Sequence, residues 1–488
     1  MLRLVHESRR VPKGQGVRRS LLARLLAASA VLLAPVALPA SEVHAAAALR
    51  SGPLWVARYS GTWLDQVYAM ALSPDGSKVF VTGKSTSQAS YDAATVAYDS
   101  ATGATLWVDR FEGATHGFDQ GTTIAVSPDG SRVFVGGVTN GPPILGSADF
   151  LTLAYDAETG GRLWASTYDG PAHLGDAVHA LAVSPDGSKV FVSGESDGDN
   201  FERDWLTIAY DAPSGTPLWH ERLGSNGSAN ALAVSPDGTE LFVSGSQVPP
   251  GFSDARATTL AYDAATGSRL WLSAYPGTGF GGDLAAVAVS GDGSRVFVTG
   301  NIDVAPYNYD YITLAYDTST GSQTWVQQYT GPYYMDKAAA IVLSPDGSKV
   351  FVTGTSDTAA ADQDFATLAY DASTGTEVWV QRFGNPFGEP DTASSVAVTP
   401  DGSTLFVTGS TYARSGWDYA TVGYSAETGD SLGVRRFNGL RHQYDYGVAV
   451  AVSPDGSKAF VTGYSEELRG SSYDYVTLAY PVGRKGRR

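Results

Sequence analysis

Aspartates at regular spacing are the residues of this chain whose type and position could do chemistry. Six of them begin the first predicted strand of an internal repeat, and seven precede its third predicted strand. The six are Asp65, Asp119, Asp176, Asp336, Asp391 and Asp445. The seven are Asp92, Asp149, Asp204, Asp310, Asp364, Asp418 and Asp474. Two rings of carboxylates could attract Ca²⁺ or a cationic ligand. We favour the structural alternative, in which each Asp accepts hydrogen bonds from loop N–H groups or a neighbouring hydroxyl, because nearly every repeat has these acids.

The fourth repeat departs from this pattern. Gly227 stands in place of its first Asp and Arg256 in place of its second. The planar guanidinium of Arg256 suits a carboxylate or phosphate ligand. The alternative, which we favour, is an ion pair between Arg256 and an Asp of an adjoining repeat.

Aromatic residues in the variable loops could form stacking platforms for a sugar or a peptide. They are Trp63, Phe280, Tyr307, Tyr309, Tyr333, Tyr334, Phe387, Tyr412 and Tyr444. Such residues also fold over a loop face without binding anything. For a ligand we single out Arg256, Tyr309, Tyr333 and Tyr334.

No catalytic residue can be assigned. The chain has no Cys, which excludes disulfides, thiolate metal sites and Cys nucleophiles. Five histidines are scattered over separate repeats without the spacing of a zinc site: His116, His173, His179, His220 and His442. The stretch 197–200 begins like a calcium loop but lacks the later Gly and Glu. Cofactor-binding residues therefore stay unknown, and the six first-strand aspartates are the only metal candidates.

An internal repeat organises most of the chain. Ser-Pro-Asp-Gly or a close variant begins at Ser73, Ser127, Ser184, Ser235, Ser290, Ser344, Thr399 and Ser453. Each copy contains four runs of alternating β-branched or aromatic residues, separated by Asp-Gly and Thr-Gly turns. In the first copy the runs are 68–72, 79–83, 94–98 and 106–111. Four antiparallel strands per repeat predict propeller blades.

The ends of the repeat array predict how the ring closes. The last copy lacks its fourth strand after Tyr480, whereas a strand of that type, 54–59, stands unused before the first copy. Pairing the two leaves no open sheet edge. We therefore predict an all-β protein: an eight-bladed β-propeller of four-stranded antiparallel blades over 54–480, closed by the N-terminal strand.

A second motif, Ala-Tyr-Asp-x-x-Thr-Gly-x-x-x-Trp, recurs in most repeats, as in 261–271. It resembles the tryptophan-docking motif of quinoprotein-like propellers with PQQ-like repeats, and the resemblance covers 54–480. The resemblance implies that each Trp packs across neighbouring blades: Trp55, Trp107, Trp164, Trp219, Trp271, Trp325 and Trp379. The seventh repeat has Leu432-Gly433 instead. The Ser-Pro-Asp-Gly half is also similar to surface-layer and TolB-like propellers.

The N-terminus predicts export. A basic stretch ending in Arg18-Arg19 precedes an apolar run over 25–40 and small residues at 43–45, so 1–45 is interpreted as a cleavable signal. Either the twin-arginine or the general secretory route is open. A short linker, 46–53, would precede the propeller, and a basic tail, 481–488, would follow it.

The net charge limits the classes of partner that the protein can bind. The formal net charge is −17, and removal of the signal, which carries +5 (seven Lys or Arg, two Glu), makes it −22. Such a protein should repel nucleic acid and anionic membranes. We expect a secreted or periplasmic monomer without a transmembrane anchor.

Geometry separates the two ends of such a propeller. Turns after the first and third strands are uniform, whereas the connections after the second and fourth strands vary, and binding sites favour variable loops on a rigid frame. We therefore predict a non-catalytic binding or scaffold protein whose acidic variable face meets an extracellular or envelope protein, a glycan or a cation. One alternative is a quinoprotein-like oxidoreductase that uses pyrroloquinoline quinone and Ca²⁺, although the cysteine pair typical of those alcohol dehydrogenases is absent. Another is a cell-surface or envelope assembly component.

Overall fold

The structure, a computed structural model, describes residues 52–483 apart from 87–89, 115, 141–146, 199–201, 225, 250, 253, 278–280, 360–361, 415, 442 and 467–471. The predicted signal lies outside the described residues, as do Phe280, His442 and the end of the basic tail. All regular structure in the described part is β-strand. No helix able to cross a membrane occurs there.

The first four blades follow the predicted repeats. Blade 1 comprises β2 (Asp65–Leu72), β3 (Lys78–Thr86), β4 (Tyr91–Asp99) and β5 (Thr105–Phe111). Blade 2 comprises β6 (Gln120–Val126), β7 (Arg132–Asn140), β8 (Ala148–Asp156) and β9 (Arg162–Tyr168). Blade 3 comprises β10 (Asp176–Val183), β11 (Lys189–Asp197), β12 (Arg203–Asp211) and β13 (Pro217–Leu223). Blade 4 comprises β14 (Ser228–Val234), β15 (Glu240–Gln247), β16 (Arg256–Asp263) and β17 (Arg269–Ala274).

The other four blades continue the series. Blade 5 comprises β18 (Gly282–Val289), β19 (Arg295–Ala305), β20 (Asn308–Asp317) and β21 (Gln323–Tyr329). Blade 6 comprises β22 (Asp336–Leu343), β23 (Lys349–Ala359), β24 (Asp362–Asp371) and β25 (Glu377–Phe383). Blade 7 comprises β26 (Asp391–Val398), β27 (Thr404–Ala413), β28 (Gly416–Ser425) and β29 (Ser431–Phe437). Blade 8 comprises β30 (Asp445–Val452), β31 (Lys458–Glu466), β32 (Tyr473–Pro481) and the N-terminal β1 (Trp55–Tyr59).

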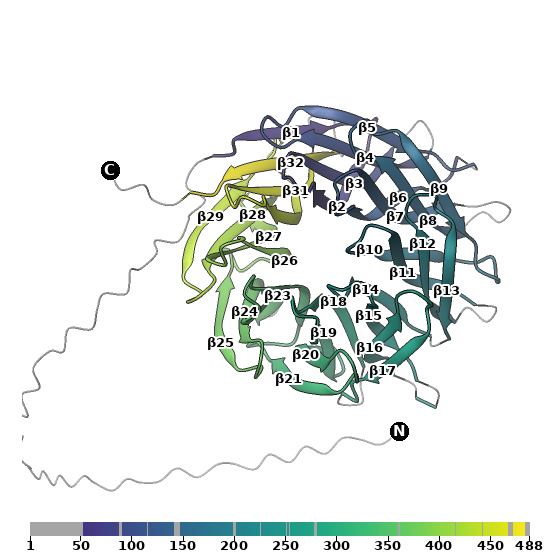
Figure 1. The fold of residues 1–488 in the computed structure, drawn as a ribbon. Helices are drawn as coiled ribbons and strands as arrows, with labels where there is room; N and C mark the ends of the chain where they lie inside the picture. Colours follow the sequence, from purple (N-terminus) through teal and green to yellow (C-terminus); the bar gives the residue numbers. More distant parts are fainter. Residues whose placement is uncertain are drawn as a thin grey trace, which may run out of the picture. The chain divides into compact units, whose positions relative to one another are not determined.

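Eight four-stranded antiparallel sheets form a ring, as predicted. In each of the first seven blades the strands pair in chain order, and the first strand of each blade, such as β2, β10 or β26, lies innermost (Figure 1). The eighth sheet has the order β1-β32-β31-β30, with Ala57 opposite Thr477. The prediction that the N-terminal strand closes the ring is therefore confirmed. This closure pairs the edge of β32 that would otherwise stand open.

The Ser-Pro-Asp-Gly segments form tight turns for a local chemical reason. In the first turn, Asp75 Oδ1 accepts hydrogen bonds from Ser73 Oγ at 2.5 Å and from the backbone N of Ser77 at 2.9 Å. Gly76 has a φ of 71°, which a residue without a Cβ adopts at no steric cost. These bonds also lower the pKa of Asp75 to about 2, so the turn keeps its anion at neutral pH.

Each docking tryptophan joins two blades. The indole Nε1 of Trp107 in blade 1 donates to the backbone O of Ala157 in blade 2 at 3.1 Å, and its ring packs against Phe80 and Tyr155. The ring also covers the Thr-Gly turn so closely that a Cβ at Gly160 would lie 2.5 Å from the indole. The other six Trp residues donate in the same way to the next blade: Trp55, Trp164, Trp219, Trp271, Trp325 and Trp379.

The missing tryptophan of blade 7 follows from the way the ring closes. Gly433 occupies the position opposite Gly423 that Trp107 occupies opposite Ala97 in blade 1. A Trp there would dock on the turn between the third and fourth strands of blade 8. The described residues contain no such turn, because the N-terminal β1 supplies the fourth strand beside β32. The seven tryptophans thus match the seven available turns.

The two ends of the ring differ as the sequence predicted. Turns after the first and third strands are all five residues long, for example 73–77 and 100–104, and we call this end the hairpin face. Connections after the second and fourth strands range from two residues (306–307) to eight (112–119), and we call this end the variable face. Both predicted aspartate rings lie at the variable face, because first and third strands begin there.

Replacing one docking indole should weaken a blade boundary. Trp107→Ala removes a buried ring and the hydrogen bond to Ala157, so we expect a loss of about 3 to 5 kcal/mol in the free energy of unfolding. Urea denaturation followed by tryptophan fluorescence and circular dichroism measures it. The matched control is Leu106→Ala, whose side chain is 45% exposed and should change stability by less than about 0.5 kcal/mol. Equal effects of the two substitutions would contradict the docking role.

Candidate functional site

The six first-strand aspartates close the loops that enter each blade. Asp119 is fully buried, and its Oδ2 accepts the backbone N–H of Gly113 at 2.7 Å. The same backbone contact to the preceding loop occurs at Asp65, Asp176, Asp336, Asp391 and Asp445. Burial raises the pKa of Asp119 above its usual value. These loop contacts are those expected of the structural alternative, and metal binding by the ring stays a prediction.

Three of the seven third-strand aspartates form an ion pair with an Arg on the fourth strand. Ion pairs join Arg110 to Asp92 at 3.0 Å, Arg222 to Asp204 at 3.1 Å and Arg382 to Asp364 at 3.4 Å. Each Arg is the third residue after the docking Trp of its blade. In blade 5, Gln328 Nε2 and Thr330 Oγ1 donate to Asp310 instead. This pairing rule was not recognised in the sequence, although the constant Trp-to-Arg spacing carries it.

Blades 2 and 4 break the pairing rule in opposite directions. Blade 2 keeps its acid, Asp149, but has Thr167 in the Arg position. Blade 4 has Arg256 in the acid position and the small Ala274 in the Arg position. Blade 2 therefore has the acid without the fourth-strand Arg, and blade 4 has neither the acid nor the fourth-strand Arg.

Arg256 lines a pocket on the variable face. Its guanidinium carbon lies 3.9 Å from the ring centre of Phe252, a cation–π contact. Tyr275, Pro276 and Ile302 help to line the pocket, which has a volume of about 270 Å³. Arg256 makes no ion pair with any described residue, so the favoured pairing with an Asp of an adjoining blade is not what the structure shows. Its N–H groups are left available for a carboxylate or phosphate.

The three predicted tyrosines come together at the boundary of blades 5 and 6. The backbone N of Tyr309 donates to the backbone O of Tyr334 at 2.7 Å, and the rings of Tyr333 and Tyr334 are 4.2 Å apart at their centres. Lys337 Nζ lies 4.4 Å from the ring centre of Tyr309. None of the three tyrosines lines the Arg256 pocket. The sequence indicated the tyrosines but not the neighbouring Lys337.

A polar chain on the innermost strands was not anticipated. His179 Nδ1 and Ser228 Oγ are 3.1 Å apart, Ser228 Oγ donates to Asn230 Oδ1 at 2.9 Å, and Asn230 Nδ2 donates to Asp283 Oδ1 at 2.7 Å. The chain crosses blades 3, 4 and 5. His179 and Asn230 are the bulged residues of their strands. A bulge re-aims one side chain, and the sequence pattern gave no sign of it.

Asp283 at the end of this chain should make stability depend on pH. Burial raises its pKa to about 6, so the folded state holds the proton more tightly than the unfolded state. Its contribution is fully present below about pH 4 and is lost as the pH rises through about 6. Asp283→Asn should therefore stabilise the protein by about 1 to 3 kcal/mol at pH 7 and by little at pH 4. Urea denaturation at the two pH values measures this difference, and an equal effect at both would contradict it.

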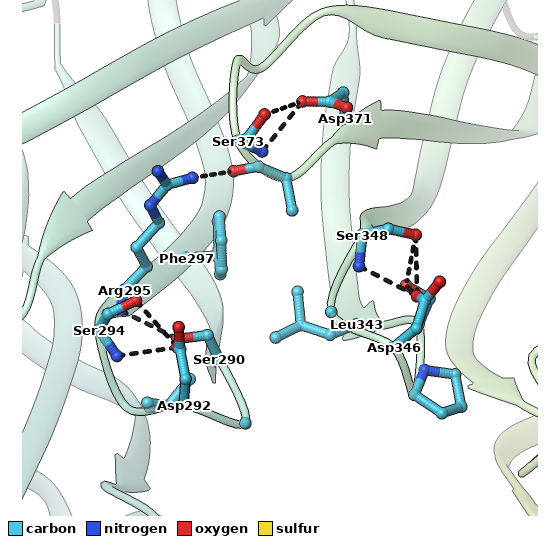
Figure 2. Close-up of a pocket in the computed structure, with 16 residues that line it drawn as sticks. Ser290, Asp292, Ser294, Arg295, Phe297, Leu343, Asp346, Ser348, Asp371 and Ser373 are labelled. Carbon is cyan, nitrogen blue, oxygen red and sulfur yellow. Dashed lines mark hydrogen bonds between the residues drawn. The ribbon is translucent and has the colours of Figure 1, made fainter.

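A groove lies on the hairpin face, between blades 5 and 6 (Figure 2). Its volume is about 790 Å³, against about 380 Å³ and 540 Å³ at the next two boundaries. Phe297 and Leu343 form apolar walls, and Arg295 Nη1 donates to the backbone O of Ala372 at 2.9 Å. Asp292 and Asp346 hold their own turns.

One glycine explains this groove. In the other seven blades the second turn residue is Pro, and its ring usually lies against the turn of the next blade; a Cβ at Gly130 would be 3.4 Å from Pro74. Blade 5 has Gly291 there, and a Cβ at Gly347 would meet nothing within 4 Å. We therefore assign the groove to a missing ring and not to a binding site.

Restoring the proline should narrow the groove and stabilise the fold. Gly291→Pro places a residue that seven equivalent turns already accept, and it reduces the entropy of the unfolded chain, for a gain of about 0.4 to 1 kcal/mol. Thermal unfolding measures the gain. A lower midpoint would show that this turn differs in backbone from the other seven.

Comparisons with known proteins agree with the geometry. A family model described as outer membrane protein assembly factor BamB (PQQ_2) matches residues 148–276 and 202–362, together less than half of the chain. The described part of the chain is an eight-bladed β-propeller, and the region that this model matches has PQQ-like repeats. A search of curated protein sequences gives no match.

The similar solved structures support only the fold of this chain. Sqt1 of Chaetomium thermophilum is 16% identical with a TM-score of 0.58, over 89% of this chain and 100% of that one. Quinohemoprotein alcohol dehydrogenase ADHIIG of Pseudomonas putida HK5 is 14% identical with a TM-score of 0.56, over 89% and 77%. The C-terminal WD40 domain of Sif2 is 12% identical with a TM-score of 0.55, over 86% and 98%. At such identities these neighbours carry no activity over to this chain.

The residues of this PQQ-like propeller do not fit the quinone that such repeats are named for. Pyrroloquinoline quinone is a tricarboxylate and needs cationic partners. The eight innermost strands, all of them described, carry five of the six buried aspartates and Asp283 but only one Lys or Arg, Lys337, and the sixth aspartate, Asp119, directly precedes β6. A multiply charged anion would therefore meet net negative charge along these strands.

Proposed function

We propose that this protein is an exported, non-catalytic binding and scaffold propeller that presents its variable face to a protein or glycan partner. The observation that carries the proposal is the distribution of exposed apolar side chains. The large exposed apolar residues of the described part fall into two groups. One group lies in or beside the outermost strands. Every member of the other group lies in a variable-face loop: Trp63, Phe252, Tyr307, Tyr333, Tyr334, Phe387, Leu440 and Tyr444.

This one-sided distribution supports a contact surface. Trp63 is 71% exposed and Tyr307 is 83% exposed, so neither contributes to the core of the propeller. Aromatic residues combine a large contact area with few rotatable bonds, and they are enriched where proteins meet partners. The turns of the hairpin face contain no exposed aromatic residue among those described.

Two features of the variable face add specificity. The guanidinium of Arg256, stacked on Phe252, offers a fork that suits a carboxylate or phosphate. The tyrosine cluster beside Lys337 offers flat faces for a sugar ring or a peptide plane. Together they suit a partner that combines anionic and flat apolar groups.

Assembly of envelope or cell-surface proteins is the role we favour within this class. The matching family model is described as an assembly factor of the outer membrane, and the N-terminal sequence predicts export. A rigid ring that holds variable loops on one side suits a scaffold. The oxidoreductase alternative is supported by the fold, which this chain shares with quinohemoprotein alcohol dehydrogenases. It is weakened because the innermost strands of this chain lack the cationic side chains that the quinone needs.

Substitution on one face should separate binding from folding. The variant Trp63→Ala, Tyr334→Ala, Phe387→Ala removes variable-face contacts, and we expect it to capture partners from an extract of the producing cells at least about tenfold more weakly. The control, Leu106→Ala, Leu163→Ala, Leu218→Ala, removes equally apolar groups from outermost strands and should capture normally. Both variants should melt like the parent.

Two results would overturn the proposed function. Equal capture by both variants would place the contact surface elsewhere. A stoichiometric chromophore after addition of pyrroloquinoline quinone and Ca²⁺, with alcohol-dependent dye reduction, would show an oxidoreductase.

A further inference from the structure

Three carboxylates gather where blade 2 meets blade 3. Asp149 stands at the start of β8, Asp169 directly follows β9, and Asp176 begins β10. One oxygen of each lies within 4.8 Å of the others. Two different blades and the loop between them thus converge on one point of the variable face.

Asp149 is the unusual member of this group. Only 7% of it is exposed, and its Oδ1 has no hydrogen-bond partner. In blades 1, 3 and 6 the equivalent Asp is paired with the fourth-strand Arg. In blade 2 that position is Thr167, so nothing on the fourth strand neutralises the buried carboxylate.

An unmatched buried carboxylate is costly to a fold. Carboxylates that lie within 4.8 Å of one another repel each other unless a cation lies among them. The nearby His173 does not replace the missing Arg, because its Nδ1 is 2.6 Å from Asp169 and its side chain is mostly exposed.

Blade 1 provides an internal control for this arrangement. Glu112, His116 and Asp119 follow Trp107 at the same spacings at which Asp169, His173 and Asp176 follow Trp164. Even the contact of His116 Nδ1 with Glu112 is repeated at 2.6 Å. The decisive difference is that Arg110 pairs with Asp92 in blade 1. The acidic loop recurs, but the unmatched charge occurs in blade 2.

We propose that Asp149, Asp169 and Asp176 bind a divalent metal ion that prefers oxygen ligands, Ca²⁺ in particular, at the boundary of blades 2 and 3. Carboxylate oxygens are the ligands that Ca²⁺ prefers, and its flexible coordination leaves room for water. His173 is a positioning residue that orients the Asp169 carboxylate. The ion would supply the positive charge that Arg supplies in other blades and would tie the loop 169–175 to both blades. This site is independent of the partner surface proposed above.

Calorimetric titration of Ca²⁺ into chelator-treated protein tests the proposal. The parent should bind one equivalent with a dissociation constant on the order of 10⁻⁴ M, and its thermal midpoint should rise with added Ca²⁺. Thr167→Arg, which installs the ion pair found in blades 1, 3 and 6, should abolish binding while the protein stays folded. Asp149→Asn should also lose binding, and it keeps the test valid if the larger Arg disturbs folding.

The matched control is Glu112→Gln, which changes the corresponding acid in blade 1 and should leave Ca²⁺ binding intact. Mg²⁺ and Zn²⁺ titrated in parallel should bind more weakly than Ca²⁺. Absence of heat with all three ions would overturn the proposal, as would unchanged Ca²⁺ binding in Thr167→Arg or Asp149→Asn. None of these measurements uses the partner, so failure here leaves the variable-face binding proposal standing.

Discussion

The contact of one indole with the turn of the next blade is the interaction on which the rest of the structure depends. In this contact, a Trp ring covers a Thr-Gly turn, and its Nε1 donates to the backbone of that turn, as for Trp107 and Ala157. Because each ring docks on a turn of the next blade, the contact joins neighbouring sheets. It also requires the hairpin face to remain uniform. Variation in loop length is therefore confined to the opposite end, where function can develop.

A second constraint operates at that variable end. Buried acids on the first strands hold loops through backbone N–H groups, and three acids on the third strands pair with a fourth-strand Arg, as in Asp92 and Arg110. Removing one member of a buried pair costs more than removing both. Blade 4 changes both positions, to Arg256 and Ala274, and Arg256 lines a pocket there. Blade 2 changes only one, so the charge balance of Asp149 calls for a ligand.

The sequence predicted the architecture well because each copy of the repeat contains short residue patterns that specify its strands and turns. Ser-Pro-Asp-Gly and Asp-x-x-Thr-Gly specify tight turns wherever they stand, and counting strands at the two ends of the array revealed the closure by β1. The absence of a Trp at Gly433 is a departure from the repeat. It follows from that closure, because the turn on which a Trp would dock is missing.

The site was predicted less completely because its contacts are not local. Arg110 and Asp92 are 18 residues apart on adjacent strands, and an Arg on an outermost strand looks like an ordinary solvated charge. The chain from His179 to Asp283 depends on strand bulges that no residue pattern announces. Arg256 stood out in the sequence because it replaces the Asp of the repeat. That Arg256 stacks on Phe252 and makes no ion pair with a described residue is visible only in three dimensions. Departures from the repeat identified where to look, and three-dimensional contacts identified what is there.

Hydrogen exchange resolved by strand is the most direct test of the account. If indole docking holds the blades together, the boundary without an indole, between blades 7 and 8, should open first. The innermost strands β26 and β30 should then exchange faster under native conditions than β6 and β10, whose blades are joined by Trp164. Uniform protection around the ring, or earliest opening at a boundary with a docked tryptophan, would contradict the account.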